Sequence, residues 1–343
     1  MKKEVTKLRH FKSFFALMAA LFLIAGLSIQ IPSAQAAGEG KVRFYTSMPT
    51  EFAAQMINVF NQKKMGVEAE LFYAPTYTTL EKLMTELRAN RVMCDVLLIA
   101  DPGPFLDLKK KGELLEYKSP EAQYYPKDHQ DKDGYWVNGR SIATNFAYNK
   151  NIISEADAPK TWWDLTDPKW KGKIGILDVR VGGTGYCWYY TLRKKFGTDY
   201  WKKLAKNEPK LFRGHGQQMD KMLTGELPIT EQLGYYVRTN IVKKGAPIKG
   251  VYASPTPITM APIAIIKRGP NNEGAKKFVD WWLSLKGQTL LQELNGCYSV
   301  RKGVPALSGK PAYDSLETIE YNWEEYNEVR MDLIDEFSEI FGL

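Results

Sequence analysis

The chain has 343 residues, of which 44% are hydrophobic and 25% are charged, so it holds enough apolar material for one large domain or two medium ones. This composition excludes a disordered protein and a small disulfide-stabilised protein. The formal net charge of +8 would suit a nucleic-acid partner only if the basic residues lie in the folded part of the chain.

The first 36 residues have the pattern of a cleaved secretory signal peptide. Five basic residues precede an apolar run at 14–27, and Ala34-Gln35-Ala36 supplies the small side chains that signal peptidase requires. A membrane anchor is the alternative, because the run up to Ile31 approaches the ~18–20 residues that span a bilayer. Pro32 and the cleavage site follow at once, and no cysteine follows to form a lipobox. The sequence therefore predicts a periplasmic or secreted protein without a lipid anchor.

Removal of this segment changes the charge and leaves few metal-binding side chains. Five of the 47 basic and one of the 39 acidic residues lie in it, so the net charge falls from +8 to +4, and we expect no nucleic-acid partner. Cys94, Cys187 and Cys297 match no zinc or redox motif; at most one pair could form a disulfide, and we expect small buried residues. With only His129 and His215 left, a histidine-rich metal site or a Ser-His or Cys-His hydrolase is not expected.

Strands and helices alternate through the first part of the mature chain. Apolar strands are predicted at 41–45, 67–73 and 94–99, and amphipathic helices at 52–63, 78–90 and 105–111. Such alternation is typical of a parallel sheet covered on both faces.

A second block of the same character begins near residue 142. Strands are predicted at 142–148 and 173–177, followed by a glycine-containing loop at 178–186 and helices to residue 195, at 200–206 and at 217–224. The proline-rich stretch 254–262 is predicted to cross back to the first block. A strand at 263–267, a helix at 272–285 and a mostly helical tail at 315–341 complete the chain.

The pattern predicts an α/β fold of two doubly wound lobes joined by a hinge, with a ligand cleft between them. The expected boundaries are a signal peptide at 1–36, the first part of lobe 1 at 37–143, lobe 2 at 144–257, and a return to lobe 1 with C-terminal helices at 258–343.

Several segments resemble the extracytoplasmic solute-binding proteins of ABC importers. They include FYTSMPTE at 44–51, DLTDPKWKGKI at 164–174, GTGY at 183–186 and AKKFVD at 275–280, in the family's order. The chain is most similar to the branch that contains binders of ferric iron, phosphonates, sugar phosphates and thiamine. The resemblance implies a type 2 periplasmic-binding-protein fold, closure of two lobes on a small ligand, and delivery to a permease in the membrane. It also implies a monomer without a catalytic cofactor.

Loops at the carboxyl ends of the strands are expected to bind the ligand. Thr46 and Ser47 precede the first helix, and Gly183, Thr184 and Gly185 precede a helix of the second lobe. Free N–H groups at helix N-termini suit an anion, and glycines let the backbone approach closely. The simpler alternative is that Ser47 and Thr184 only cap their helices.

Four more residues are candidates for ligand contact on the same reasoning. Thr76 and Tyr77 follow the second strand, and Asp101 follows the third. Arg180 precedes the glycine loop, and its planar fork suits a carboxylate, carbonate or phosphate.

The family resemblance also suggests a metal. Tyr235 and Tyr236 are similar in spacing to the paired tyrosine ligands of ferric-iron binders, in what is expected to be a loop, and Glu51 lies where many iron binders have a carboxylate. Tyrosinate is a hard anionic donor that suits Fe(III). The histidine of that first loop is missing here, and iron branches without it use additional tyrosines or an anion such as carbonate held by an arginine. Fe(III) as cargo, with a synergistic anion, is the main hypothesis.

Three alternatives remain open. The same helix N-termini could bind a phosphonate, a sugar phosphate or a similar organic anion without metal. A secreted enzyme would need a pair of carboxylates in the cleft, and no such pair stands out in the sequence. A sensor that reports its ligand to a membrane partner would look the same as a transport protein.

Overall fold

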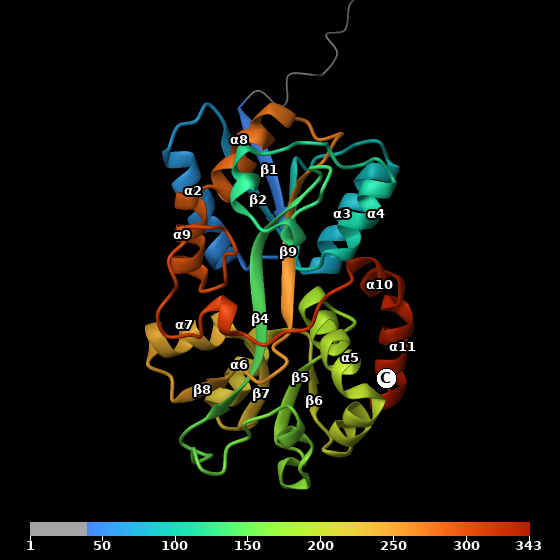
Figure 1. The fold of residues 1–343 in the computed structure, drawn as a ribbon, viewed down its shortest axis with the longest axis vertical. Helices are drawn as coiled ribbons and strands as arrows, with labels where there is room; N and C mark the ends of the chain where they lie inside the picture. Colours follow the sequence, from blue (N-terminus) through green and yellow to red (C-terminus); the bar gives the residue numbers. More distant parts are fainter. Residues whose placement is uncertain (1–39) are drawn as a thin grey trace, which may run out of the picture. The chain divides into compact units, whose positions relative to one another are not determined.

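The computed structural model describes residues 40–343, so the predicted signal peptide lies outside the described residues. Nine strands form a mixed sheet in the order β2-β1-β3-β9-β4-β7-β5-β6, with β8 paired to β4 (Figure 1). The strands are β1 (Lys41–Thr46), β2 (Glu68–Tyr73), β3 (Val96–Leu98), β4 (Val137–Asn149), β5 (Ile174–Leu177), β6 (Lys210–Phe212), β7 (Ile229–Leu233), β8 (Ile248–Val251) and β9 (Ile258–Ile265). β1 pairs in parallel with β2 and β3, and β5 does so with β6 and β7, whereas β4, β8 and β9 are antiparallel to every strand they pair with.

The helices cover the sheet with the apolar faces that their sequence spacing predicts. They are α2 (Thr50–Gln62), α3 (Thr76–Arg88), α4 (Gly103–Lys110), α5 (Gly183–Lys206), α6 (His215–Leu223), α7 (Gly234–Lys244), α8 (Asn272–Leu283), α9 (Leu285–Asn295), α10 (Trp323–Glu328) and α11 (Arg330–Phe341). In α2, for example, Phe52, Met56 and Phe60 recur at helical spacing and are all buried. None of the helices in this part of the chain is long and apolar enough to cross a membrane.

The long strands β4 and β9 lie side by side and join two parts of the sheet (Figure 1). β4 pairs with β9 as far as Ala143, and from Thr144 onward it pairs with β7 instead. The strand predicted at 263–267 begins five residues earlier, because β9 starts at Ile258 within the proline-rich stretch that was predicted to cross back to the first block. Pro262 is tolerated in this strand because it lies opposite Asn138, where the pairing register shifts.

Separate hydrophobic clusters stabilise the two parts of the sheet. Next to β1, Phe44 packs on Phe278 and Trp282 with ring centroids 5.0 Å and 5.2 Å apart. Next to β5, a second cluster contains Trp188 and Trp201, whose rings are 4.8 Å apart. All three cysteines are buried free thiols, which confirms the expectation that they are small core residues.

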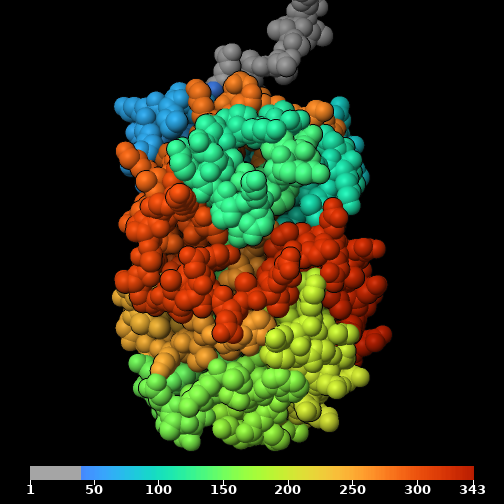
Figure 2. Space-filling view, viewed as in Figure 1, coloured from blue at the N-terminus to red at the C-terminus, as the bar shows by residue number. Residues whose placement is uncertain are grey.

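The C-terminal segment, residues 296–343, contacts helices that lie on both parts of the sheet. Residues of this segment, coloured orange to red, form a band across the middle of the face seen in Figure 2. α10 packs on α4, where Asn327 Nδ2 donates to Asp107 Oδ1 at 2.9 Å. α11 packs on α5, where Arg193 Nε lies 2.7 Å from Glu336 Oε1. The tail therefore connects α4, which follows β3, with α5, which follows β5.

Candidate ligand-binding site

A pocket of about 370 Å³ lies where strand ends of both parts of the sheet meet. Its lining comes from the ends of β1, β2, β3, β5 and β7, from the middle of β4, and from the starts of five helices. The lining residues are Ser47, Pro49, Tyr73, Pro75, Thr76, Ala100, Arg140, Ile142, Leu177, Val181, Gly182, Thr184, Arg213, Gly214, His215, Gly216, Gln217, Leu233, Tyr235 and Tyr236.

Five helices begin at this pocket, and none of them has a side-chain cap. The N-cap residues of α2, α3, α5, α6 and α7 all line the pocket; they are Pro49, Pro75, Gly182, Gly214 and Leu233. Of the helices that begin elsewhere, α8, α9 and α10 are each capped by the side chain of an Asn or Ser, whereas α4 and α11 have no side-chain cap. The first N–H groups of a helix need acceptors, and the helix dipole makes them favourable for negative charge. The five helices that face the pocket thus begin with N–H groups that no capping side chain accepts from.

The ionised side chains at the pocket are basic. Arg140 and Arg213 line it, and none of the described residues in its lining is an aspartate or a glutamate. The guanidinium of Arg213 is exposed and has no hydrogen-bond or ion-pair partner among the described residues. The site therefore favours a ligand with negative charge.

Aromatic rings form one wall of the pocket. The rings of Tyr235 and Tyr236 stack with centroids 4.7 Å apart, and the imidazole of His215 stacks on Tyr236 at 6.4 Å. His215 Nε2 lies 3.0 Å from Oε1 of Glu231, a buried carboxylate of β7. The contact with Glu231 holds the imidazole in place at the start of α6.

Burial and neighbouring groups raise the pKa values of the phenols of this wall above the ordinary value of a tyrosine. Burial, together with Glu51, raises the pKa of Tyr236 to about 12. Burial also raises the pKa of Tyr235 well above its ordinary value. Any metal that binds these oxygens would have to displace their protons.

Five predicted site residues line the pocket: Ser47, Thr76, Thr184, Tyr235 and Tyr236. The alternative that Ser47 and Thr184 only cap their helices is wrong, since the N-caps of α2 and α5 are Pro49 and Gly182. Ser47 Oγ instead accepts from the backbone N of Ala100 at 3.0 Å and so links the ends of β1 and β3. The expectation of a loop around the two tyrosines is also wrong, because both lie in the first turn of α7.

The other predicted residues lie beside the pocket and have protein partners. Thr46 Oγ1 accepts from the backbone N of Met48 at 3.0 Å. Tyr77 donates from its hydroxyl to Asp101 Oδ2 at 3.1 Å, and Asp101 is fully buried. Arg180 pairs with Asp178, with Nε–Oδ1 and Nη2–Oδ2 distances of 2.9 Å and 2.8 Å. The fork of Arg180 is thus occupied by a carboxylate of the protein.

Gly183, Gly185 and Glu51 are the remaining predicted site residues. Gly183 lies against Ala100, and Gly185 packs on Leu177. Glu51 lines a neighbouring hollow of the surface that also contains Tyr236. Ligand contact by any of these residues remains a prediction.

Sequence reasoning missed Tyr73, Arg140, Arg213 and His215, which all line the pocket. Arg213 and Gly214 precede α6, which begins at His215, as Val181 and Gly182 precede α5, which begins at Gly183. The likeness of these two helix starts could have been read in the sequence. Within the described chain, no group of three or more His, Cys, Asp or Glu residues could hold a metal ion. A metal here would depend on tyrosine oxygens.

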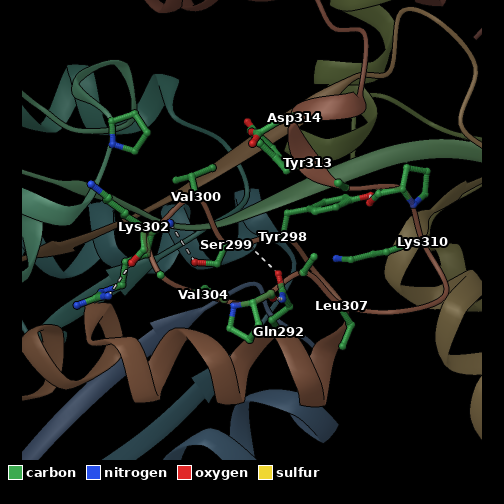
Figure 3. Close-up of a pocket in the computed structure, with 17 residues that line it drawn as sticks. Gln292, Tyr298, Ser299, Val300, Lys302, Val304, Leu307, Lys310, Tyr313 and Asp314 are labelled. Carbon is green, nitrogen blue, oxygen red and sulfur yellow. Dashed lines mark hydrogen bonds between the residues drawn. The ribbon is translucent and has the colours of Figure 1, made fainter.

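A second cavity of about 300 Å³ lies under the loop that follows α9 (Figure 3). In it, Lys310 Nζ donates to the carbonyl oxygens of Gly296 at 2.9 Å and Cys297 at 2.7 Å. The same amine lies 3.5 Å from the ring centroid of Tyr298. Lys310 therefore binds the C-terminal end of α9, where a cation is favourable, and attaches the loop to the core.

Lys310 is expected to make stability depend on pH. Burial lowers the pKa of Lys310 to about 8 from an ordinary 10.5, so between these values the unfolded chain holds a proton that the folded chain has lost. The free energy of unfolding of the wild-type protein, relative to that of Lys310→Met, should thus rise from pH 8 to pH 10. Urea unfolding at both pH values measures this difference, and Lys302→Met, an exposed lysine of the same loop, serves as control. A difference from Lys310→Met that stays constant or shrinks would contradict the expectation.

Comparisons with known proteins agree with this architecture. Iron uptake protein A1 of Synechocystis is 25% identical over 304 residues, which cover 82% of this chain and 81% of that protein. The structure of iron-bound HitA from Pseudomonas aeruginosa has a TM-score of 0.79 at 21% identity, covering 89% of this chain and 100% of that one. AfuA from Actinobacillus pleuropneumoniae, solved with fructose-6-phosphate bound, has a TM-score of 0.80 at 23% identity with the same coverage. These likenesses confirm the predicted α/β periplasmic-binding-protein fold.

A family match covers most of the chain as well. Residues 93–330 match the bacterial extracellular solute-binding proteins, from just before β3 to the first residue of α11. The chain therefore belongs to the family of bacterial extracellular solute-binding proteins.

Proposed function

We propose that this solute-binding protein captures a small organic anion, such as a sugar phosphate or phosphonate, and delivers it to the permease of an ABC importer. The set of five uncapped helix N-termini at one pocket supports this proposal most directly. Phosphate and carboxylate groups are the ligands that such N-termini bind. The structural neighbour AfuA was solved with a sugar phosphate bound, which agrees with the proposal.

Closure of two lobes on the ligand is part of the proposal. We place the lobe boundaries at 143/144 and 257/258, because β4 changes its partner from β9 to β7 after Ala143 and β9 begins at Ile258. A ligand that contacts α2 and α3 on one side and α5, α6 and α7 on the other stabilises the closed form, since the open form offers only one set of contacts.

Ferric iron is the second candidate cargo, and three tyrosines support it. Tyr73, Tyr235 and Tyr236 line the pocket together, and Tyr73 raises the pKa of both of the others, so the three phenols are neighbours. Arg140 lies next to Tyr235 and Tyr236 and could pair with a synergistic anion. Iron-binding relatives and structural neighbours agree with this candidate.

An enzymatic role is not part of the proposal. Hydrolysis in this pocket would need an acid and a base, and the described lining offers no pair of carboxylates. Binding and release remain the functions that the lining supports.

Thermal unfolding with separate ligands distinguishes the two candidates. Glucose 6-phosphate, glycerol 3-phosphate and methylphosphonate are each tested at about one hundred times the dissociation constant. At least one should raise Tm by about 4 °C, because the ligand binds only the folded state. Ferric citrate should leave the protein colourless and its Tm unchanged.

The opposite pattern would favour iron. A visible tyrosinate-to-iron band with ferric citrate, lost in Tyr235→Phe and kept in the exposed control Tyr124→Phe, together with no effect of the phosphates, would contradict the organic-anion proposal. The absence of any response to phosphates, phosphonate or iron would contradict both candidates.

A further inference from the structure

Arg140 is a buried arginine without a partner. Its side chain comes from the middle of β4 and lines the pocket, yet only 2% of the residue is exposed. Its Nε and Nη1 atoms are buried and have no hydrogen-bond acceptor among the described residues. No described carboxylate lies within ion-pair distance of its guanidinium.

Such a group is costly to bury alone. An ionised side chain removed from water needs an opposite charge or several acceptors, and an arginine cannot lose its proton to avoid the penalty. A well-packed protein would normally supply a carboxylate, as Asp178 does for Arg180. At Arg140 the adjoining open space is the ligand pocket, so the missing acceptor is expected to come from the ligand.

Arg140 and Arg213 have different neighbours. Burial raises the pKa of Tyr235 and of Cys297, and the charge of Arg140 partly offsets this, so Arg140 lies on the tyrosine side of the pocket. Arg213 precedes α6 and acts on Asp178, in the loop that leads to α5. The pocket thus has one cationic position at the tyrosine wall and another at the N-termini of α5 and α6.

We propose that the ligand carries two anionic groups, a phosphate or phosphonate bound at the N-termini of α5 and α6 with Arg213, and a carboxylate bound by the fork of Arg140. This inference rests on the proposed function and specifies its substrate class as phosphorylated or phosphonylated carboxylic acids. Arg140 is then the residue that distinguishes these compounds from simple phosphate esters. A planar carboxylate satisfies two N–H groups of a guanidinium at once.

The test uses two probes of equal length. 3-Phosphoglycerate has a phosphate and a carboxylate, whereas glycerol 3-phosphate has a hydroxymethyl group in place of the carboxylate. Calorimetry should show that the mature protein binds 3-phosphoglycerate at least about tenfold more tightly, the range of one charge-assisted pair. The dissociation constants of Arg140→Met for the two probes should lie within about threefold of each other. Arg140→Lys, which keeps the charge without the fork, should retain a reduced preference.

Two further measurements separate recognition from a structural role. Because Arg140 is unpaired without ligand, Arg140→Met should raise the Tm of the ligand-free protein, whereas a structural arginine would lower it. Arg268→Met removes an arginine paired with Glu113 on the surface and should keep the preference for 3-phosphoglycerate.

The outcomes distinguish this inference from the proposed function. Equal affinity of the wild-type protein for both probes, or binding of glycerol 3-phosphate alone, would overturn the two-anion ligand and leave an organic-anion binder. A preference that persists in Arg140→Met, or a lowered Tm in that variant, would overturn the role of Arg140. If neither probe binds, the two-anion ligand is overturned, and the thermal-shift panel decides separately whether the protein binds anions at all.

Discussion

Replacement of Gly183 by alanine is expected to weaken ligand binding about 10- to 100-fold, whereas the same change at Gly182, which also lines the pocket but where an added Cβ meets no other atom within 4 Å, should weaken it less. A Cβ atom at Gly183 would lie 2.0 Å from the carbonyl oxygen of Ala100 and 2.6 Å from the Cβ of Asp101. Ala100 and Asp101 follow β3, and Gly183 begins α5, so this contact joins the two sides of the pocket. An added methyl group forces these sides apart, and a ligand can no longer contact both at full strength.

Gly182 is a matched control at the neighbouring position. Its φ of −169° is extended backbone that alanine adopts without strain, and a Cβ there meets no atom within 4 Å. Calorimetry with the organic phosphate that gives the largest thermal shift measures the affinity of both variants, and scattering at small angles measures whether Gly183→Ala is more open. Unchanged affinity in Gly183→Ala would show that the contact with Ala100 is not part of the bound state.

The fold was predictable wherever one face of a helix or strand is buried and the other is exposed to solvent. The periodicity of α2 and α3 predicted both helices to within two residues at each end, because their apolar stripes meet the sheet. β7 was missed, since its central residues Thr230, Glu231 and Gln232 are polar although all are fully buried. Their burial depends on tertiary partners, such as His215 for Glu231, and local sequence carries no information about those contacts.

The candidate site was predictable where a loop motif marks it and not where a strand supplies the residue. Ser47 was found because it stands in the loop before α2, and Thr184 because it belongs to a glycine-rich motif at the start of α5. Arg140 lies inside β4, and only the pairing of β4 with β9 brings it to the pocket. Arg180 was the more obvious arginine in sequence, yet Asp178, two residues earlier, neutralises it. An aspartate two residues before the arginine already indicated in the sequence that Arg180 could have a partner within the protein.

Arg330→Met is expected to destabilise the protein by about 3 kcal/mol, because it leaves the carboxylate of Asp101 buried without its counter-ion. Arg330 Nη2 lies 3.2 Å from Asp101 Oδ1, and the side chain of Asp101 is fully buried. Tyr77 and the backbone N of Gly103 remain as donors and offset part of the loss. Denaturation by urea measures the change. Arg193→Met, which breaks the more exposed pair with Glu336, should cost below about 1 kcal/mol.

The loss in Arg330→Met should also shrink in acid. Burial raises the pKa of Asp101 above its ordinary value, and the charge of Arg330 lowers it in part, so removal of Arg330 raises this pKa further. The folded variant then binds a proton more readily than the unfolded chain does, and stability is regained as the pH falls from neutral through the raised pKa towards the ordinary carboxyl value. Asp101→Asn in the same chain should recover much of the loss at pH 7, because no buried charge remains. A deficit that is independent of pH and unchanged by Asp101→Asn would mean that Arg330 acts through packing of α11 rather than through its charge.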